Sequence, residues 1–342
     1  MVYNISIFKE AIPLLIIVDC GMTNMRCRLV AGGRIISEVK KRSLVSGKEE
    51  PRLPLIGILS EATEELLKFN SLKKSDVEAI VCSGILSSDV GIHRVPHVMM
   101  PAGLKKSASG AEAVRLPEYP DIPVFFIPGI RTSPERGGSE SELIAGLDSM
   151  SGEECETYGI MKLCGLTGDF TLALPGTYNK TLYIDKDGRI AIMQTGMCGE
   201  FMAAISGNTI LRHALPSPLI GEINEKMLFL GFDLAEKLGT SPSLIKARNA
   251  MVWGGYTKED CGNLFVGAAL HDDIIGALGV CRPGVPFYIG GSDPLRHIFA
   301  LLLHRIGIDA KELDDGVTSV CSAVGAAEVF NEYIKTHGGI NI

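Results

Sequence analysis

The fold is decided by Ile17-Val-Asp-Cys-Gly-Met-Thr-Asn-Met-Arg-Cys-Arg-Leu29 and by a later stretch that repeats its outline, Leu172-Ala-Leu-Pro-Gly-Thr-Tyr-Asn-Lys-Thr-Leu-Tyr183. Each stretch predicts an apolar strand, a tight turn containing Gly, Thr and Asn, a basic residue after the turn, and a returning strand. A glycine hairpin follows both, at Ala31-Gly-Gly-Arg-Ile35 and at Lys186-Asp-Gly-Arg-Ile190. A unit that occurs twice in one chain indicates two similar lobes. We expect each lobe to present a phosphate-binding turn to a shared cleft.

Composition and charge argue against several classes of protein. The chain has 342 residues, 46% of them hydrophobic, and a net charge of -7, which suits two ordinary domains. Acids and bases are interspersed without a basic block, so we expect neither nucleic acid nor a membrane as partner. The nine cysteines include no Cys-x-x-Cys pair, which favours reduced thiols and a cytoplasmic protein. The short apolar run Ala11 to Val18 contains Pro13 and predicts no signal peptide.

The first half of the chain is typical of an α/β lobe. Apolar runs joined by glycine turns predict a strand meander at 14–18, 25–30 and 34–39, followed by an amphipathic helix at 54–69. Continuous apolar runs at 77–82 and 123–127 are typical of strands buried on both faces of a parallel sheet. Because ligands bind at the carboxyl ends of such strands, we expect Ser83 and Gly84 near a binding site.

Two further features complete this lobe. Residues 85–121 lack strong periodicity and are rich in Gly, Pro, Ser and His, which predicts a long substrate-binding loop. Ser139 and Glu142 fit a capping box at the start of the next helix. We place the boundary at the Ser-Gly and acidic patch around Gly152, which gives an N-terminal lobe of residues 1–152 and a C-terminal lobe of residues 153–342.

The second half repeats the meander at 170–194 and then becomes strongly helical. Helices are expected at 200–205, 221–238, 242–251 and 258–278, with Gly, Pro and Ser clusters between them. A short strand at 287–289 precedes Gly290-Gly291-Ser292, and helices at 294–305 and 323–334 close the chain. The last helix is able to return to the first lobe.

The turn after the first strand carries the sharpest chemical signal. Asp19 ends a predicted buried strand, where a carboxylate can hold the hydration shell of Mg²⁺. The backbone at Gly21, the Thr23 hydroxyl and Asn24 can then contact phosphate oxygens. The alternative is a hairpin whose Asp and Asn only satisfy turn amides, and the pattern by itself favours that alternative.

The turn at Gly176, Thr177 and Lys180 is the expected counterpart. Gly176 and Thr177 offer N–H and O–H donors to phosphate, and Lys180 offers a cation for the transferring charge. Taken alone, this turn indicates an ordinary hairpin with a solvated lysine. Its similarity to the first turn reverses that preference.

Glu140 and three other features are weaker candidates. Glu140 can activate a hydroxyl or bind Mg²⁺ through water, or it only interacts with the dipole of the helix that Ser139 caps. Gly290-Gly291-Ser292 suits the passage of an adenine or ribose over bare backbone. His97 and the nearby His93 are expected to line the binding loop rather than to hold a metal. Arg248 is a surface ion-pair partner or a cleft arginine, and the sequence favours the surface.

Five stretches, in order along the chain, carry a family resemblance. They are Asp19-Cys-Gly-Met-Thr-Asn-Met-Arg26, Gly84-Ile-Leu-Ser-Ser88 with Pro96-His97 and Pro101-Ala102, Pro128-Gly-Ile130 with Gly137-Gly-Ser-Glu-Ser-Glu142, Pro175-Gly-Thr-Tyr-Asn-Lys180, and Met197-Cys-Gly-Glu200. Together they resemble motifs of the 2-dehydro-3-deoxygalactonokinases. In that family the third stretch contains Arg-Gly-Glu-Glu-Thr-Gln. The later arginine helix and glycine loop of the family are similar to Arg248 and Gly290-Gly-Ser292.

The resemblance implies an α/β fold of two ribonuclease-H-like lobes, that of actin-like ATPases and sugar kinases, with a central ligand cleft. It implies phosphorylation of a hydroxyl of a 2-keto-3-deoxy sugar acid, with ATP and Mg²⁺. Asp19 and Glu140 would be catalytic, with Asp19 also the metal ligand. The substrate-binding residues would be Ser83, Gly84, His97, Glu200 and Arg248. The expected partners are the sugar acid and ATP, and a homodimer is left open.

Four departures from the family keep two alternatives open. The family Trp is Cys20, the first Glu of the Glu-Glu pair is Ser139, a helix glutamate corresponds to Ala269, and the motif arginine falls at Gly137 unless Arg136 substitutes. One alternative is a non-catalytic sensor of sugar acid or nucleotide. The other is a phosphohydrolase in which Glu140 orients water. We rank the kinase first and the sensor second.

Overall fold

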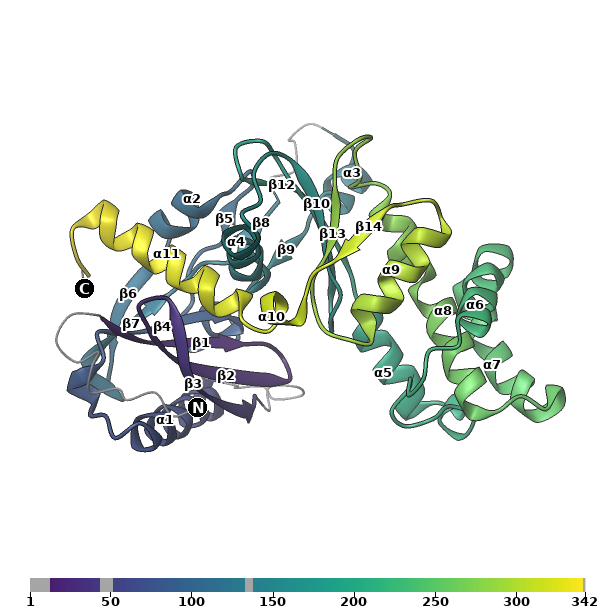
Figure 1. The fold of residues 1–342 in the computed structure, drawn as a ribbon, viewed down its shortest axis with the longest axis horizontal. Coiled ribbons are helices and arrows are strands. Elements are labelled where there is room, and N and C mark those ends of the chain that lie inside the picture. The colour runs from purple at the N-terminus through teal and green to yellow at the C-terminus, as the bar shows by residue number, and fades with distance from the viewer. Residues whose placement is uncertain (1–12, 44–51, 133–137, 341) are drawn as a thin grey trace. The chain divides into compact units, whose positions relative to one another are not determined.

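The computed structural model describes residues 13–43, 52–132, 138–340 and 342, which form two compact units (Figure 1). The first unit holds the described residues up to Gly168, residues 187–190 and those from Gly316 onward; the second holds 169–186 and 191–315. The start of the Ala11 to Val18 run and the motif arginine position at 136 or 137 lie outside the described residues. Among the described residues, no helix is both long enough and apolar enough to cross a membrane.

The first unit is built on a six-stranded sheet in the order β3-β2-β1-β4-β7-β6. Its strands are β1 (Leu14–Cys20), β2 (Asn24–Ala31), β3 (Arg34–Arg42), β4 (Ala79–Gly84), β6 (Glu112–Leu116) and β7 (Tyr119–Phe126). β1 pairs antiparallel with β2 and parallel with β4, and β4 pairs parallel with β7. All six residues of β4 are buried, as expected of a central parallel strand. The predicted meander and the buried parallel strands are confirmed.

The α-helices described in the first unit are α1 (Arg52–Phe69), α2 (Leu104–Ser109), α3 (Glu140–Ala145), α4 (Glu153–Cys164), α10 (Asp315–Thr318) and α11 (Cys321–His337). Of these, α1 and α11 contact strands of the sheet. A small separate sheet contains β5 (Val98–Met99), β8 (Ile130–Arg131) and β9 (Ser149–Met150). The buried ring of Phe125 on β7 meets Phe330 and Tyr333 edge-on, so α11 packs against the sheet of the first unit.

Residues 85–121 are more regular than the sequence predicted. They contain β5, α2 and β6, and β6 forms an antiparallel hairpin with β7. The expectation of an irregular loop is therefore wrong, because β6 is a sheet-edge strand of mixed polarity whose alternation is too weak to recognise. A role for this stretch in substrate binding stays a prediction.

Helix α4 begins directly after Gly152 and was not predicted from the sequence. Its buried face includes Glu154 and Thr157, and polar residues on a buried face obscure the apolar periodicity of a helix. The first compact unit continues beyond this helix to Gly168.

The second unit repeats the strand arrangement of the first. Its sheet has the order β12-β11-β10-β13-β14, with β10 (Phe170–Leu174), β11 (Asn179–Ile184), β12 (Ile190–Gly196), β13 (Phe287–Ile289) and β14 (Ala310–Glu312). β10 pairs antiparallel with β11 and parallel with β13, just as β1 pairs with β2 and β4. Its helices are α5 (Cys198–Asn208), α6 (Glu225–Leu238), α7 (Thr240–Gly254), α8 (Lys258–Ala277) and α9 (Leu295–Arg305). The predicted duplication is therefore present in the strands.

Replacing Gly325 with alanine tests the packing of α11 on α4. A Cβ on Gly325 would lie 1.8 Å from the carbonyl oxygen of Cys155, so the helices would have to separate. We expect Gly325→Ala to lower the free energy of unfolding by about 1–3 kcal/mol, measured by urea denaturation. The matched control is Gly57→Ala in α1, where a Cβ meets nothing within 4 Å. That variant should gain about 0.5–1 kcal/mol, and equal stability of the two variants would contradict the packing described.

Candidate functional site

Asp19 lies at the carboxyl edge of the first sheet, between two neighbouring strands. It is half-buried and is in register with Arg26 on β2 and with Ser83 on β4. The following turn is closed by a hydrogen bond of 2.9 Å from the Gly21 N–H to the Asn24 carbonyl oxygen. Gly21 and Thr23 are exposed, so the predicted turn exists and the Thr23 side chain is accessible to a ligand.

Two glycines bring distant segments to Asp19. Gly84 ends β4 with φ 76°, and a Cβ there would lie 2.2 Å from the Cys20 carbonyl oxygen. Only glycine allows this approach of β4 to β1. Gly152 precedes α4, and a Cβ on it would lie 3.4 Å from Gly84 Cα and 3.9 Å from Asp19 Oδ1. The ends of β1 and β4 and the start of α4 therefore meet, and we call this place the Asp19 junction.

The first turn of α4 supplies carboxylates to the Asp19 junction. Glu154 is fully buried, and both its oxygens accept a hydrogen bond from the Gly152 N–H, at 2.9 and 2.8 Å. Burial raises the pKa of Glu154 to about 8, and the nearby charges of Glu153 and Asp19 add to the increase. Burial also raises the pKa of Glu156 to about 8, with Asp19 and Glu153 contributing. Both acids can therefore hold a proton close to neutral pH.

The family motif quoted above could have identified these acids. Gly152-Glu-Glu-Cys-Glu156 contains Gly-Glu-Glu without interruption, whereas the sequence analysis placed that motif at residues 137–142. The capping box of Ser139 and Glu142 is confirmed, but every residue of α3 is exposed. Within the described part of the chain, no contact joins Glu140 to Asp19. A catalytic role for Glu140 stays a prediction. The acids found near Asp19 lie on α4 instead.

His97 reaches the same junction through Ser151. The Nε2 atom of His97 lies 3.1 Å from Ser151 Oγ, and Ser151 directly precedes Gly152. Burial lowers the pKa of His97, which favours a neutral imidazole near pH 7. Ser83 differs, because it is fully buried and its hydroxyl donates to the Val18 carbonyl oxygen over 3.4 Å. This hydrogen bond joins β4 to β1. Because Ser83 is not exposed, its predicted contact with substrate is not supported.

The second unit holds the counterpart turn at the end of β10. The Gly176 N–H donates to Asn179 Oδ1 over 2.9 Å, so this donor is used inside the turn rather than offered to a ligand. Thr177 is exposed, and its carbonyl oxygen accepts the Glu200 N–H from the first turn of α5. The Tyr178 hydroxyl donates to the Glu200 carboxylate over 2.5 Å. The turn and the predicted residue Glu200 are thus brought together.

Lys180 is not a solvated lysine. Only 5% of it is exposed, and its Nζ donates to Thr195 Oγ1 on β12 over 2.7 Å. The alternative of a solvated side chain is therefore wrong. Burial of this ammonium places a fixed positive charge beneath the turn.

The glycine loop after β13 lies against the same turn. The Gly290 N–H donates to the Ala173 carbonyl oxygen over 2.8 Å, and a Cβ on Gly291 would lie 2.7 Å from the Pro175 carbonyl oxygen. Two predicted nucleotide-binding segments therefore adjoin within the second unit, and Ser292 is exposed beside them. Arg248 lies apart on α7, half-buried, and no ion pair is found for it among the described residues.

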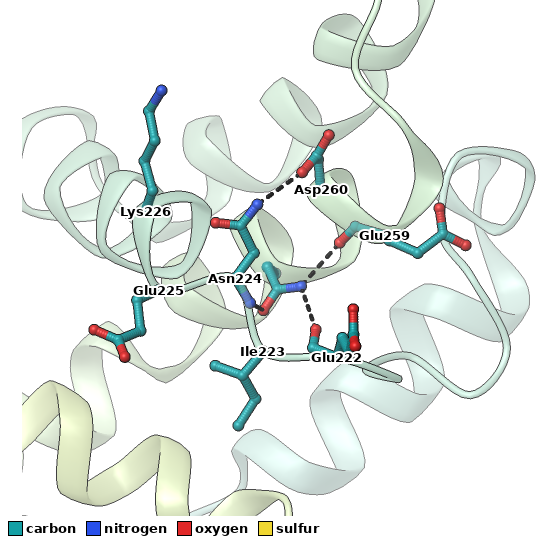
Figure 2. Close-up of a pocket in the computed structure, with 8 residues that line it drawn as sticks. Glu222, Ile223, Asn224, Glu225, Lys226, Glu259 and Asp260 are labelled. Carbon is teal, nitrogen blue, oxygen red and sulfur yellow. Dashed lines mark hydrogen bonds between the residues drawn. The ribbon is translucent and has the colours of Figure 1, made fainter.

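A hollow of about 560 Å³ lies among the helices of the second unit (Figure 2). Its lining includes four acids, Glu222, Glu225, Glu259 and Asp260, against the single base Lys226. Asn263 inside it donates to the carbonyl oxygens of Glu222 and Glu259, so its amide joins the segment before α6 to α8. An acidic lining repels phosphate and carboxylate groups. We therefore do not assign this hollow to an anionic substrate.

Replacing Glu154 with glutamine tests its buried, raised-pKa state. The folded protein keeps a proton on Glu154 that the unfolded chain releases above its usual pKa of 4.5. The stability linked to that proton is complete below pH 4.5 and is lost as the pH rises towards 8. Since glutamine cannot ionise, the stability of Glu154→Gln relative to wild type should increase between pH 5 and pH 8 in urea titrations. The exposed control Glu140→Gln should show no such trend, and a difference independent of pH would refute the assignment.

Comparisons with known proteins show the family and the fold of this chain. The model of a family described as 2-keto-3-deoxy-galactonokinase matches residues 19–326. Among curated proteins, no sequence matches this chain. A provisionally assigned 2-dehydro-3-deoxygalactonokinase from Sinorhizobium meliloti superposes with a TM-score of 0.74 at 19% identity, over 92% of this chain and 95% of that one. Component A of the (R)-2-hydroxyglutaryl-CoA dehydratase of Acidaminococcus fermentans gives a TM-score of 0.50 at 12% identity, over 94% and 99%.

These matches settle the fold and the class of enzyme. The likeness of the solved structures confirms the predicted α/β fold of actin-like ATPases and sugar kinases. The family match covers most of the chain and identifies a phosphotransferase that acts on a sugar acid. The chain therefore belongs to the 2-keto-3-deoxy-galactonokinase family.

Proposed function

We propose that this chain transfers a phosphoryl group from ATP, in the presence of Mg²⁺, to a hydroxyl of a 2-keto-3-deoxy sugar acid of the galactonate type. Family membership supports the reaction class. The observation that carries the assignment of residues is the meeting of Asp19, Gly84 and Gly152 at one sheet edge, with Glu154 beneath them. Ligands of open α/β sheets bind at such edges.

The residues of the Asp19 junction suit Mg²⁺. Among the described residues, no group of three metal-ligating side chains is found. Mg²⁺ does not need such a cage, because proteins commonly hold it through one or two carboxylates, water and the phosphates of the substrate. Asp19 is half-buried, and its carboxylate oxygens would hold the ion. The bound ion would neutralise phosphate charge.

The remaining residues would bind and orient the two substrates. We assign the exposed Thr23 turn and the exposed Thr177 to ATP phosphates, with Lys180 supplying fixed positive charge and Gly290-Gly291-Ser292 passing beside the nucleoside. His97, Gly84, Glu200 and Arg248 are assigned to the sugar acid. Positioning and charge neutralisation contribute most of the catalysis of phosphoryl transfer, so these few groups suffice.

Two acids are candidates for the base that accepts the proton of the sugar hydroxyl. Glu140 is exposed on α3. Glu156 lies in the first turn of α4, and burial raises its pKa to about 8, close to the pH range in which a general base exchanges its proton. Glu154 is fully buried and is assigned to holding Gly152 rather than to proton transfer. A cytoplasmic location and a homodimer stay predictions.

Replacing Asp19 with alanine should abolish transfer without unfolding the chain. We expect at least about a 10³-fold loss of ADP release, because the charge that organises Mg²⁺ is removed. The assay couples ADP release to a panel of 2-keto-3-deoxy sugar acids, and the urea midpoint reports folding. Asp121→Ala, which removes an exposed carboxylate on β7, is the matched control and should keep full activity. Full activity of Asp19→Ala would contradict the metal role.

The same assay separates the alternatives. Release of phosphate from ATP without any sugar acid would favour the phosphohydrolase. Thermal stabilisation by a sugar acid with no ADP formed across the panel would favour the non-catalytic sensor. The departures at Cys20, Ser139 and Ala269 motivate that second test.

A further inference from the structure

We infer that Asp273, on α8, is a positioning residue that fixes the Gly176 to Lys180 turn and thereby sets the affinity of this chain for the phosphate donor. The inference rests on the proposed function, which assigns this turn to ATP phosphates. Asp273 lies in none of the motifs that carry the family resemblance. Its contacts are what single it out.

The connection from Asp273 to the turn runs through one amide side chain. Asp273 Oδ2 accepts a hydrogen bond of 2.5 Å from Asn179 Nδ2, and Asn179 Oδ1 accepts the Gly176 N–H. Because an ionised carboxylate only accepts hydrogen bonds, the NH₂ group of Asn179 must face Asp273. The carbonyl end of the amide must then face the turn. The charge on α8 therefore dictates which end of Asn179 holds the backbone of Gly176.

Asp273 also fixes the helix that supports the turn from its other side. The carboxylate accepts a hydrogen bond from the Cys198 N–H, at the first residue of α5. A Cβ on Gly196, at the end of β12, would lie 2.3 Å from Asp273 Cγ, so the carboxyl group sits directly against this backbone. Two residues further along α5, the Glu200 N–H donates to the Thr177 carbonyl oxygen. One carboxylate is thus connected to two adjacent residues of the turn, to Gly176 through Asn179 and to Thr177 through α5.

Burial makes these hydrogen bonds consequential. Burial raises the pKa of Asp273, and the neighbouring charge of Asp272 adds to the increase, whereas the bonds from Asn179 and Cys198 oppose it. A carboxylate that is partly buried, as Asp273 is, costs free energy unless donors compensate it, and hydrogen bonds to a charged acceptor are stronger than those to a neutral one. A residue whose only task was to fill space would be apolar here. The charge is explained by the two donors that it orients.

Asp273→Asn breaks this arrangement with little change of shape. The new side chain has one acceptor oxygen for two donors, and its NH₂ group has no acceptor at Asn179 Nδ2. We expect the KM for ATP to rise about tenfold and the KM for the sugar acid to stay within about twofold of wild type. The split follows because the turn assigned to ATP loses its direct support at Asn179, whereas Glu200 keeps its own hydrogen bonds to Tyr178 and Thr177. The assay is ADP release with each substrate varied in turn.

The exchange Asn179→Asp with Asp273→Asn should restore function. A carboxylate at 179 accepts both the Gly176 N–H and the new amide at 273, and the carbonyl oxygen of that amide accepts the Cys198 N–H. All three hydrogen bonds are therefore possible again, with the two groups exchanged. We expect the KM for ATP to return to within about threefold of wild type, although Asn179→Asp alone should be as impaired as Asp273→Asn.

Asp272→Asn is the matched control, because Asp272 is exposed on the same helix and bonds to Thr240 instead. It should leave both KM values unchanged. An unchanged KM for ATP in Asp273→Asn, an equal rise of both KM values, or no recovery in the exchange variant would each overturn the inference. If the wild-type chain forms no ADP with any sugar acid, the proposed function fails, and calorimetric titration of the same variants with Mg²⁺ and ATP still decides the inference. A tenfold weaker Kd in Asp273→Asn supports it, and an equal Kd, or no binding to wild type, overturns it.

Discussion

The close approach of β4 to β1 is the constraint on which the candidate site depends. Gly84 stands where any side chain would collide with the Cys20 carbonyl oxygen, and it allows the two parallel strands to end together. Asp19 is thereby held at an edge that also receives Gly152 and the first turn of α4. A protein interior is too closely packed to accept another methyl group at such a place. Asp19 can therefore occupy this edge because residue 84 has no side chain.

In each unit, a carboxylate on a helix holds the backbone N–H of a glycine beside the candidate site. In the first unit, Glu154 accepts the Gly152 N–H directly. In the second, Asp273 acts through the amide of Asn179 on the Gly176 N–H. Burial raises the pKa of both acids, which shows that each is kept at an energetic cost. Such costs are expected at functional sites, where rigid placement of backbone groups matters more than stability.

Sequence reasoning succeeded where a signal was local and failed where it was not. The strands around Asp19 and Gly176, and the capping box at Ser139, depend on residues a few positions apart, and all are present. Helix α4 was missed because a buried Glu154 breaks the apolar pattern on which helix recognition relies. The turn taken alone indicated a solvated lysine, since a charged side chain after a turn is usually exposed, and only the similarity of the two turns argued against a solvated Lys180. Its burial depends on Thr195, a partner from another strand.

By itself, the sequence determined the duplicated strand-turn-strand unit, the family and therefore the class of reaction, because these depend on the order and spacing of residues along the chain. Only the tertiary structure decided which acids surround Asp19, which end of Asn179 faces the Gly176 turn, and that Ser83 is sealed inside the sheet. Those facts depend on contacts between residues such as Asn179 and Asp273 or Asp19 and Gly152, which are separated by about a hundred positions or more. Packing brings such residues together, and no periodicity along the chain records it.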